Sequence, residues 1–69
     1  MLYPYDSLTP LEKEMATSQL LSIYEDWAYD GDEFDKELYN KLLNDENYRL
    51  EKLRSCSFER DGDYIYILL

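Results

Sequence analysis

The side chains in this sequence that are able to do chemistry are mostly carboxylates. Aspartate and glutamate number 16, lysine and arginine together number 7, and histidine is absent, so the net charge at pH 7 is −9. The imbalance is concentrated in residues 24–47, where nine acids meet only two lysines and the local net charge is −7. These nine candidate partner-binding residues are Glu25, Asp26, Asp30, Asp32, Glu33, Asp35, Glu37, Asp45 and Glu46. Carboxylates one helical turn apart are separated by about 5–6 Å, on the order of the spacing of phosphates in a nucleic acid, so they predict a cationic protein groove as partner.

The residue types present argue against catalysis and against direct nucleic-acid binding. Without histidine there is no imidazole base, and the single cysteine, Cys56, falls where a strand would turn its thiol towards the core. We therefore predict no catalytic residue, no metal site, no cofactor and no enzymatic activity. The negative charge also excludes nucleic acid and disfavours anionic membranes as ligands, because binding to both depends on cations.

A degenerate calcium loop is the lesser alternative for the same acids. Asp26, Asp30, Gly31 and Glu37 occupy positions 1, 5, 6 and 12 of an EF-hand-like frame. Position 3 is Ala28, however, where an oxygen ligand is expected, and there is no second loop to pair with the first. In so acidic a chain we interpret the match as a coincidence.

Helices must position most of these acids. Thr9 is expected as the N-cap of a first helix, with Pro10 at the first helical position and Glu12 completing a capping box. Apolar residues at mostly three- and four-residue steps extend this helix over about 10–29, and Gly31 is expected to end it. The apolar stripe consists of Leu11, Met15, Leu20, Ile23, Tyr24, Trp27 and Ala28.

A further helical region is predicted over about 33–54. Asp32 is expected to cap it. Its inner face carries Phe34, Leu38, Leu42 and Leu43. The polar residues 44–47 leave two interpretations open, one continuous helix with a polar turn or a break followed by a third segment, and we favour the break.

The last residues, about 55–69, predict a β-hairpin. Asp61-Gly62 suits a two-residue type I′ turn between strands near 55–60 and 63–68. In that register Phe58 faces Ile65 and Cys56 faces Ile67 on the inner face, while Glu59 faces Tyr64 and Ser57 faces Tyr66 on the outer face. Residues 1–5 are expected as an edge strand, although Pro4 cannot donate a hydrogen bond to its neighbour. The chain is thus predicted as a single α+β domain over 1–69, with two or three helices followed by a C-terminal hairpin.

A cytoplasmic location is expected from the cysteine count and the N-terminus. One cysteine excludes an intramolecular disulfide, which favours a reducing compartment. The first residues show neither the basic nor the apolar region of a signal peptide. No run approaches the roughly 18 apolar residues that span a bilayer.

In size, acidity, lack of histidine and helix-plus-hairpin outline, the chain resembles the small DNA-mimic proteins that phages and mobile elements use against host DNA-binding proteins. That group includes inhibitors of restriction enzymes, uracil-DNA glycosylase, CRISPR effectors and the nucleoid protein HU. The resemblance covers the whole chain in composition but includes no shared motif, so it transfers no functional residue. It implies an inhibitor in the host cytoplasm whose partner is a basic DNA-binding protein, with HU an attractive target.

The alternative function is an interaction or regulatory module with an apolar contact. Its surface would be the Tyr-rich hairpin and residues 65–69, which could pair edge to edge with a second copy and form a homodimer. The acids would then serve solubility, as they do on many small proteins. Aromatic residues bear on both functions, because they are either interface anchors or ordinary core residues. Those interleaved with the acids are Tyr24, Trp27, Tyr29, Phe34 and Tyr39.

Overall fold

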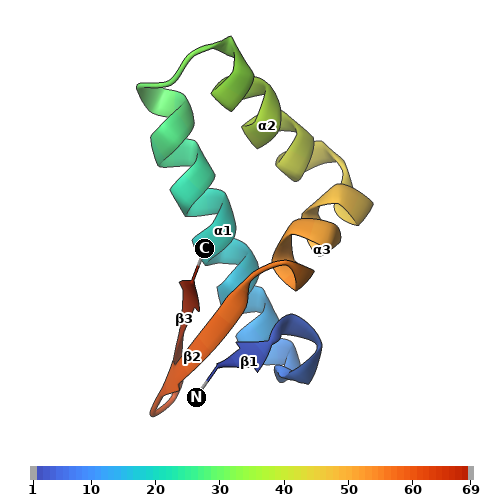
Figure 1. The fold of residues 1–69 in the computed structure, drawn as a ribbon, viewed down its shortest axis with the longest axis vertical. Coiled ribbons are helices and arrows are strands. Elements are labelled where there is room, and N and C mark those ends of the chain that lie inside the picture. The colour runs from blue at the N-terminus through green and yellow to red at the C-terminus, as the bar shows by residue number, and fades with distance from the viewer. Residues whose placement is uncertain (1, 69) are drawn as a thin grey trace.

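Three α-helices and a three-stranded antiparallel sheet make up the fold, which a computed structural model describes over residues 2–68 (Figure 1). In chain order the elements are β1 (Tyr3–Pro4), the 3-10 helix η1 (Tyr5–Ser7), α1 (Pro10–Tyr29), α2 (Glu33–Asn44), α3 (Glu46–Arg54), β2 (Ser57–Asp61) and β3 (Tyr64–Leu68). The α+β class is confirmed. The predicted edge strand is present as β1, although Met1, like Leu69 of the predicted hairpin, lies outside the described residues.

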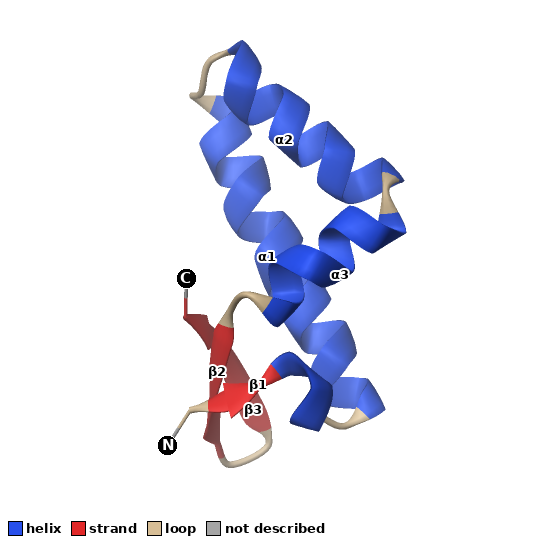
Figure 2. Ribbon diagram, turned by 45° about the vertical axis from the view of Figure 1, so that its right-hand side comes forward, coloured by secondary structure: helices blue, strands red, loops and turns tan. Residues whose placement is uncertain are grey.

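The sheet lies at one end of an elongated molecule of 36 × 22 × 17 Å, and the turn between α1 and α2 lies at the other. The sheet lies beside the N-terminal half of α1, and α1 runs on well past it to the turn that leads into α2 (Figure 1). From that turn α2 returns along α1, and α3 bends back towards the sheet (Figure 2). The α1–α2 turn is therefore the end of the molecule farthest from the sheet.

Helix α1 begins and ends where local sequence signals predict. The Thr9 hydroxyl accepts a hydrogen bond from the Glu12 amide at 3.2 Å, and the Thr9 amide donates to the Glu12 carboxylate at 2.9 Å, which completes the capping box. Gly31 follows the helix as predicted, but its φ is not positive. A glycine is needed there because a Cβ atom would overlap the carbonyl oxygen of Trp27 and the side chain of Asp35.

Two aspartates define the remaining helices. The Asp32 carboxylate accepts hydrogen bonds from the first amides of α2, those of Phe34 and Asp35, at 3.0 and 3.2 Å. Asp45 ends α2 through its own amide and caps α3 by accepting a hydrogen bond from the Tyr48 amide at 3.1 Å. The predicted break is therefore confirmed, and a single aspartate makes it.

The hairpin is present, but its predicted register is wrong by two residues. Gly62 has a φ of +63° and Asp63 does not have a positive φ, so the loop residues are Gly62-Asp63 and fit a type II′ turn. The observed partners are Ser57 with Leu68, Phe58 with Ile67, Glu59 with Tyr66, Arg60 with Ile65 and Asp61 with Tyr64. A shift of two residues keeps every side chain on its predicted face, since faces alternate with a period of two.

The hydrophobic core is centred where the sheet, α1 and α3 meet. Its largest fully buried side chains are Leu20, Leu42, Leu53, Phe58 and Ile65. Several residues of the predicted inner helix faces are instead exposed, namely Leu11 at 63%, Trp27 at 49%, Phe34 at 64% and Leu43 at 43%. The prediction failed at Trp27 and Phe34 because the sheet does not extend to the α1–α2 turn, so no third layer covers that end.

Candidate functional site

The structure brings seven of the nine candidate acids together at the α1–α2 turn. We call residues 25–37 the acidic tip; against its seven acids it contains one base, Lys36. The seven are Glu25, Asp26, Asp30, Asp32, Glu33, Asp35 and Glu37. The other two, Asp45 and Glu46, lie at the opposite end of α2, a helix of 12 residues, and are about 18 Å away along its axis. The single face predicted from the sequence is thus a tip and a separate corner.

The carboxylates of the tip face solvent and are not neutralised by ion pairs. All seven residues are exposed except Asp35, which is half-buried. Among residues 2–68 the ion pairs are those of Asp6 with Arg54 and of Glu12 with Arg60, and both lie near the sheet. The tip therefore presents its negative charge uncompensated.

Helix geometry accounts for about half of the nine acids. Asp32 and Asp45 are N-cap residues, and Glu33, Asp35 and Glu46 lie in the first turns of α2 and α3. A negative charge at a helix N-terminus interacts favourably with the helix dipole, by about 0.3–1 kcal/mol at an exposed position. These five residues have a structural role whether or not a partner binds them.

The acids at the C-terminal end of α1 have no such role. Asp26 lies in the last turn, which contains no basic residue, and Asp30 is the C-cap residue. Negative charge there opposes the helix dipole, and it lowers stability by an amount similar to the gain at an N-terminus. Glu33 and Glu37 add like-charge repulsion of about 0.2–0.5 kcal/mol one turn apart. Folding stability therefore does not explain Asp26 and Asp30.

Glu25 faces across the helical hairpin towards α2. Partial burial, with the nearby Glu25 carboxylate as the second cause, raises the pKa of the Tyr39 hydroxyl above its ordinary value. Tyr39 and Tyr24 are half-buried, which makes them part of the α1–α2 contact. Glu25 thus borders the packed part of the hairpin, where the exposed tip begins.

Three aromatic side chains of the tip are open to solvent. Trp27 is 49% exposed, Tyr29 87% and Phe34 64%. Trp27 makes an edge-on contact with Tyr24, with ring centroids 5.0 Å apart, which holds one side of its ring. Of the five aromatics interleaved with the acids, these three are available to a partner.

The calcium frame does not form a loop. Residues 26–29 belong to α1 and residues 33–37 to α2, so only residues 30–32 connect the helices. In the part of the chain that the structure describes, no group of three or more Cys, Asp or Glu side chains is placed to hold a metal ion. The acids at positions 1 and 12 of the frame are helical residues.

The apolar alternative meets an obstacle at the edge of the sheet. The Gln19 side-chain amide donates to the Ile65 carbonyl at 2.7 Å and accepts from the Ile67 amide at 2.9 Å, so it occupies the outer edge of β3. Ile65 is fully buried, as predicted for the inner face of the hairpin, so it is not part of the exposed surface that the apolar alternative assigned to residues 65–69. Our sequence interpretation overlooked Gln19. This residue lies four positions from both Met15 and Ile23, so a polar side chain interrupts the apolar stripe there.

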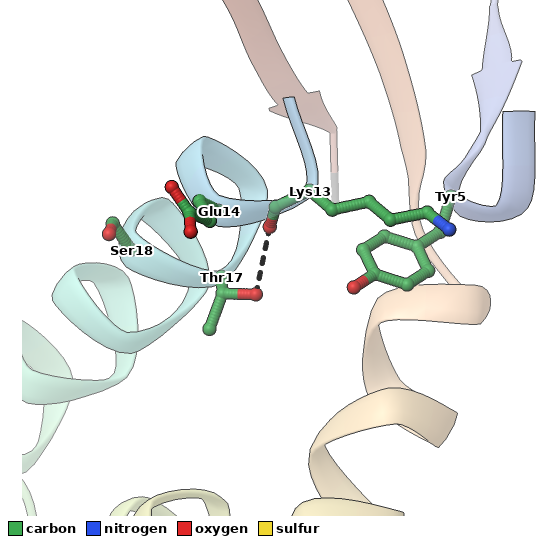
Figure 3. Close-up of a pocket in the computed structure, with 5 residues that line it drawn as sticks. All are labelled: Tyr5, Lys13, Glu14, Thr17 and Ser18. Atoms are coloured by element: carbon green, nitrogen blue, oxygen red, sulfur yellow. Dashed lines mark hydrogen bonds between the residues drawn. The ribbon is translucent and has the colours of Figure 1, made fainter. Parts of the chain in front are cut away.

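The remaining reactive groups are engaged locally. A shallow hollow beside α1 is lined by Tyr5, Lys13, Glu14, Thr17 and Ser18. Figure 3 shows the Lys13 side chain extending to the Tyr5 ring and the Thr17 hydroxyl bonded to the Lys13 carbonyl, at 2.9 Å. Partial burial raises the pKa of the Cys56 thiol, which donates to the Lys52 carbonyl. None of these groups forms a nucleophile–base pair.

Comparison with known proteins identifies no relative, so we argue the function from the surface of the molecule. No family model, curated protein or solved structure matches the chain. Within residues 2–68, no helix combines the length and the apolar character that crossing a bilayer requires. The acidic tip, with seven acids in residues 25–37, is therefore the surface from which we argue a function.

Proposed function

We propose that this protein is a DNA-mimic inhibitor whose acidic tip occupies the DNA-binding site of a basic host protein. The observation that carries the proposal is the placement of Asp26 and Asp30, exposed carboxylates that oppose the dipole of α1 and have no ion-pair partner among residues 2–68. A domain of this size has little stability to spare. Charges that lower its stability are therefore best explained by a function that needs them.

The shape of the molecule suits this role. The acidic tip is the narrow end of a helical hairpin, remote from the sheet, so it is able to enter a groove without moving the core (Figure 1). Its net charge of −6 over residues 25–37 would steer it towards a cationic site and speed association. Asp45 and Glu46 form a separate negative corner at the other end of α2 and would contact only the rim of a larger site.

The partner class follows from the charge. A site built from lysine and arginine to hold phosphates is the surface most complementary to the acidic tip. The nucleoid protein HU fits this description, and so do restriction, repair and CRISPR proteins. The proposed inhibitor needs no cofactor and acts by occupying the site.

The test is displacement of labelled duplex DNA from purified HU, measured by fluorescence anisotropy at increasing salt. The variant carries Asp26→Asn and Asp30→Asn. The control carries Glu14→Gln and Glu59→Gln, which removes the same charge from exposed positions outside the tip. We expect the tip variant to lose affinity on the order of tenfold and the control to change little.

A pull-down from a bacterial lysate extends the test to other targets. The proteins retained by the immobilised wild-type chain are eluted with a salt gradient and, separately, with DNA. Elution by both is the expected result for a mimic, because counterion screening and competition act on the same site. Equal binding by the tip variant and its control would contradict the proposal.

The alternative is a module that binds through apolar contact, and one observation supports it. Tyr64, Tyr66 and Leu68 are 60%, 49% and 42% exposed on the outer face of β3. Because Gln19 occupies the strand edge, such a partner would pack face-on, and the predicted edge-to-edge homodimer would need Gln19 displaced. Binding that survives added salt would favour this alternative.

A further inference from the structure

The exposed aromatic rings of the tip narrow the class of partner. We call Trp27, Tyr29 and Phe34 the aromatic row; they fall within eight consecutive residues and are at least 49% exposed. The core of the fold lies near the sheet and leaves these rings uncovered. An exposed aromatic group of this kind marks a contact surface more often than an isolated apolar side chain does.

Each ring of the row has an exposed carboxylate as its chain neighbour. Asp26 precedes Trp27, Asp30 follows Tyr29 and Glu33 precedes Phe34. Neighbouring Cα atoms are about 3.8 Å apart, so each ring is close to a negative charge. Ring and charge therefore alternate along the sequence of the tip.

Protein sites for duplex and for single-stranded nucleic acid differ in whether they offer contacts for aromatic rings as well as for charges. A duplex keeps its bases stacked inside and offers mainly phosphates to a nonspecific protein, so its site is lined by cations. A site for a single strand combines a cationic groove with aromatic side chains on which the bases stack. Only the second kind of site has positions for rings as well as for charges.

We propose that the acidic tip fits a protein cleft that binds single-stranded nucleic acid, with the aromatic row at base-stacking positions and the carboxylates at phosphate positions. The inference rests on the proposed function and names the partner class for the same site. Charge complementarity selects a cationic cleft, and the exposed rings select one with stacking surfaces.

The experiment compares two competitions under identical conditions. In one, the chain displaces labelled oligothymidine from a bacterial OB-fold single-strand-binding protein; in the other, it displaces labelled duplex DNA from HU. We expect half-displacement of oligothymidine at a concentration at least tenfold lower than that of the duplex. The ring variant carries Tyr29→Ala and Phe34→Ala and should lose at least tenfold in the oligothymidine assay, as stacked rings do.

A matched control separates recognition from general apolar contact. It carries Tyr64→Ala and Tyr66→Ala, which removes two exposed rings from the sheet end, and it should displace oligothymidine as well as the wild type does. Circular dichroism checks that both variants are folded. Displacement of the duplex alone, unaffected by the ring variant, would overturn the inference and leave the proposed function standing. Displacement in neither assay would also overturn it, and the lysate pull-down then decides the proposed function independently.

Discussion

The two ends of this molecule share one helix, α1, but differ in what their residues contribute. The base, which we define as the sheet, η1, α3 and residues 10–20 of α1, contains the fully buried side chains Leu20, Leu53, Phe58 and Ile65. It also contains both ion pairs found among residues 2–68. The acidic tip buries only Ala28 and exposes its charges and rings. The groups that stabilise the fold and the exposed groups that we propose to bind a partner therefore lie at opposite ends of the molecule.

The ion pair of Arg60 shows most clearly how the base differs from the acidic tip. Its guanidinium donates to both oxygens of Glu12, at 2.7 and 2.8 Å, and lies 4.3 Å from the centroid of the Tyr3 ring. This bidentate pair joins β2 to the first turn of α1. Two acids near the sheet are thus paired with arginines, whereas no ion pair among residues 2–68 involves a carboxylate of the tip.

The largest expected effect on stability comes from comparing a phenylalanine-to-alanine substitution in the base with one in the tip. Phe58→Ala in the base should destabilise the fold by about 3–5 kcal/mol, because it empties a fully buried site. Phe34→Ala in the tip should change stability by less than about 0.5 kcal/mol, since its ring is 64% exposed. Urea unfolding followed by circular dichroism measures both. Similar losses from the two variants would refute the division of roles.

A smaller effect of opposite sign is expected from neutralising the C-terminal end of α1. Asp26→Asn and Asp30→Asn should each raise the free energy of unfolding by about 0.3–1 kcal/mol, because an unfavourable interaction with the helix dipole is removed. The same variant should bind the partner more weakly. A gain in stability with a loss of binding would support the division of roles between the two ends, whereas a loss of stability would show that these acids are structural.

The smallest expected effect is that of Glu12 on stability, and it is measured by lowering the pH. Hydrogen bonding to Arg60, followed by the Thr9 amide, lowers the pKa of Glu12 from 4.5 to about 2. A depressed pKa in the folded state means that the contribution is full above about pH 4.5 and is lost as the pH falls towards 2. Glu12→Gln should therefore flatten the dependence of stability on pH between these values. An unchanged slope in pH-dependent urea titrations would contradict the assigned pair.

Local sequence signals were sufficient for the helices. Thr9, Pro10 and Glu12 predicted the start of α1, and Asp32 predicted the cap of α2, because these residues act on amides within a few positions. Asp45 was included only in a polar stretch, yet it is the residue that ends one helix and begins the next. Local chemistry thus predicts where helices change direction.

Features that depend on distant residues were predicted less well. The dipeptides Asp61-Gly62 and Gly62-Asp63 both satisfy two-residue turns, so the register is decided by contacts across the fold, such as that of Arg60 with Glu12. Apolar periodicity placed Phe34 on a helix face, but it contains no information about what lies opposite. For the same reason the sequence grouped Asp45 and Glu46 with acids that lie at the other end of α2.

The side-chain amide of Gln19 has a consequence for the concentration that this protein is expected to reach without aggregating. Strand β3, with the sequence YIYIL, is uncharged and rich in β-branched and aromatic residues, the composition of segments that assemble into fibrils. By bonding the Ile65 carbonyl and the Ile67 amide, one side chain takes up two of the backbone groups that a strand from another molecule would need. Under the proposed function the chain would have to match its target in number, because it acts by occupancy, and we expect Gln19 to help it reach that level by protecting this edge.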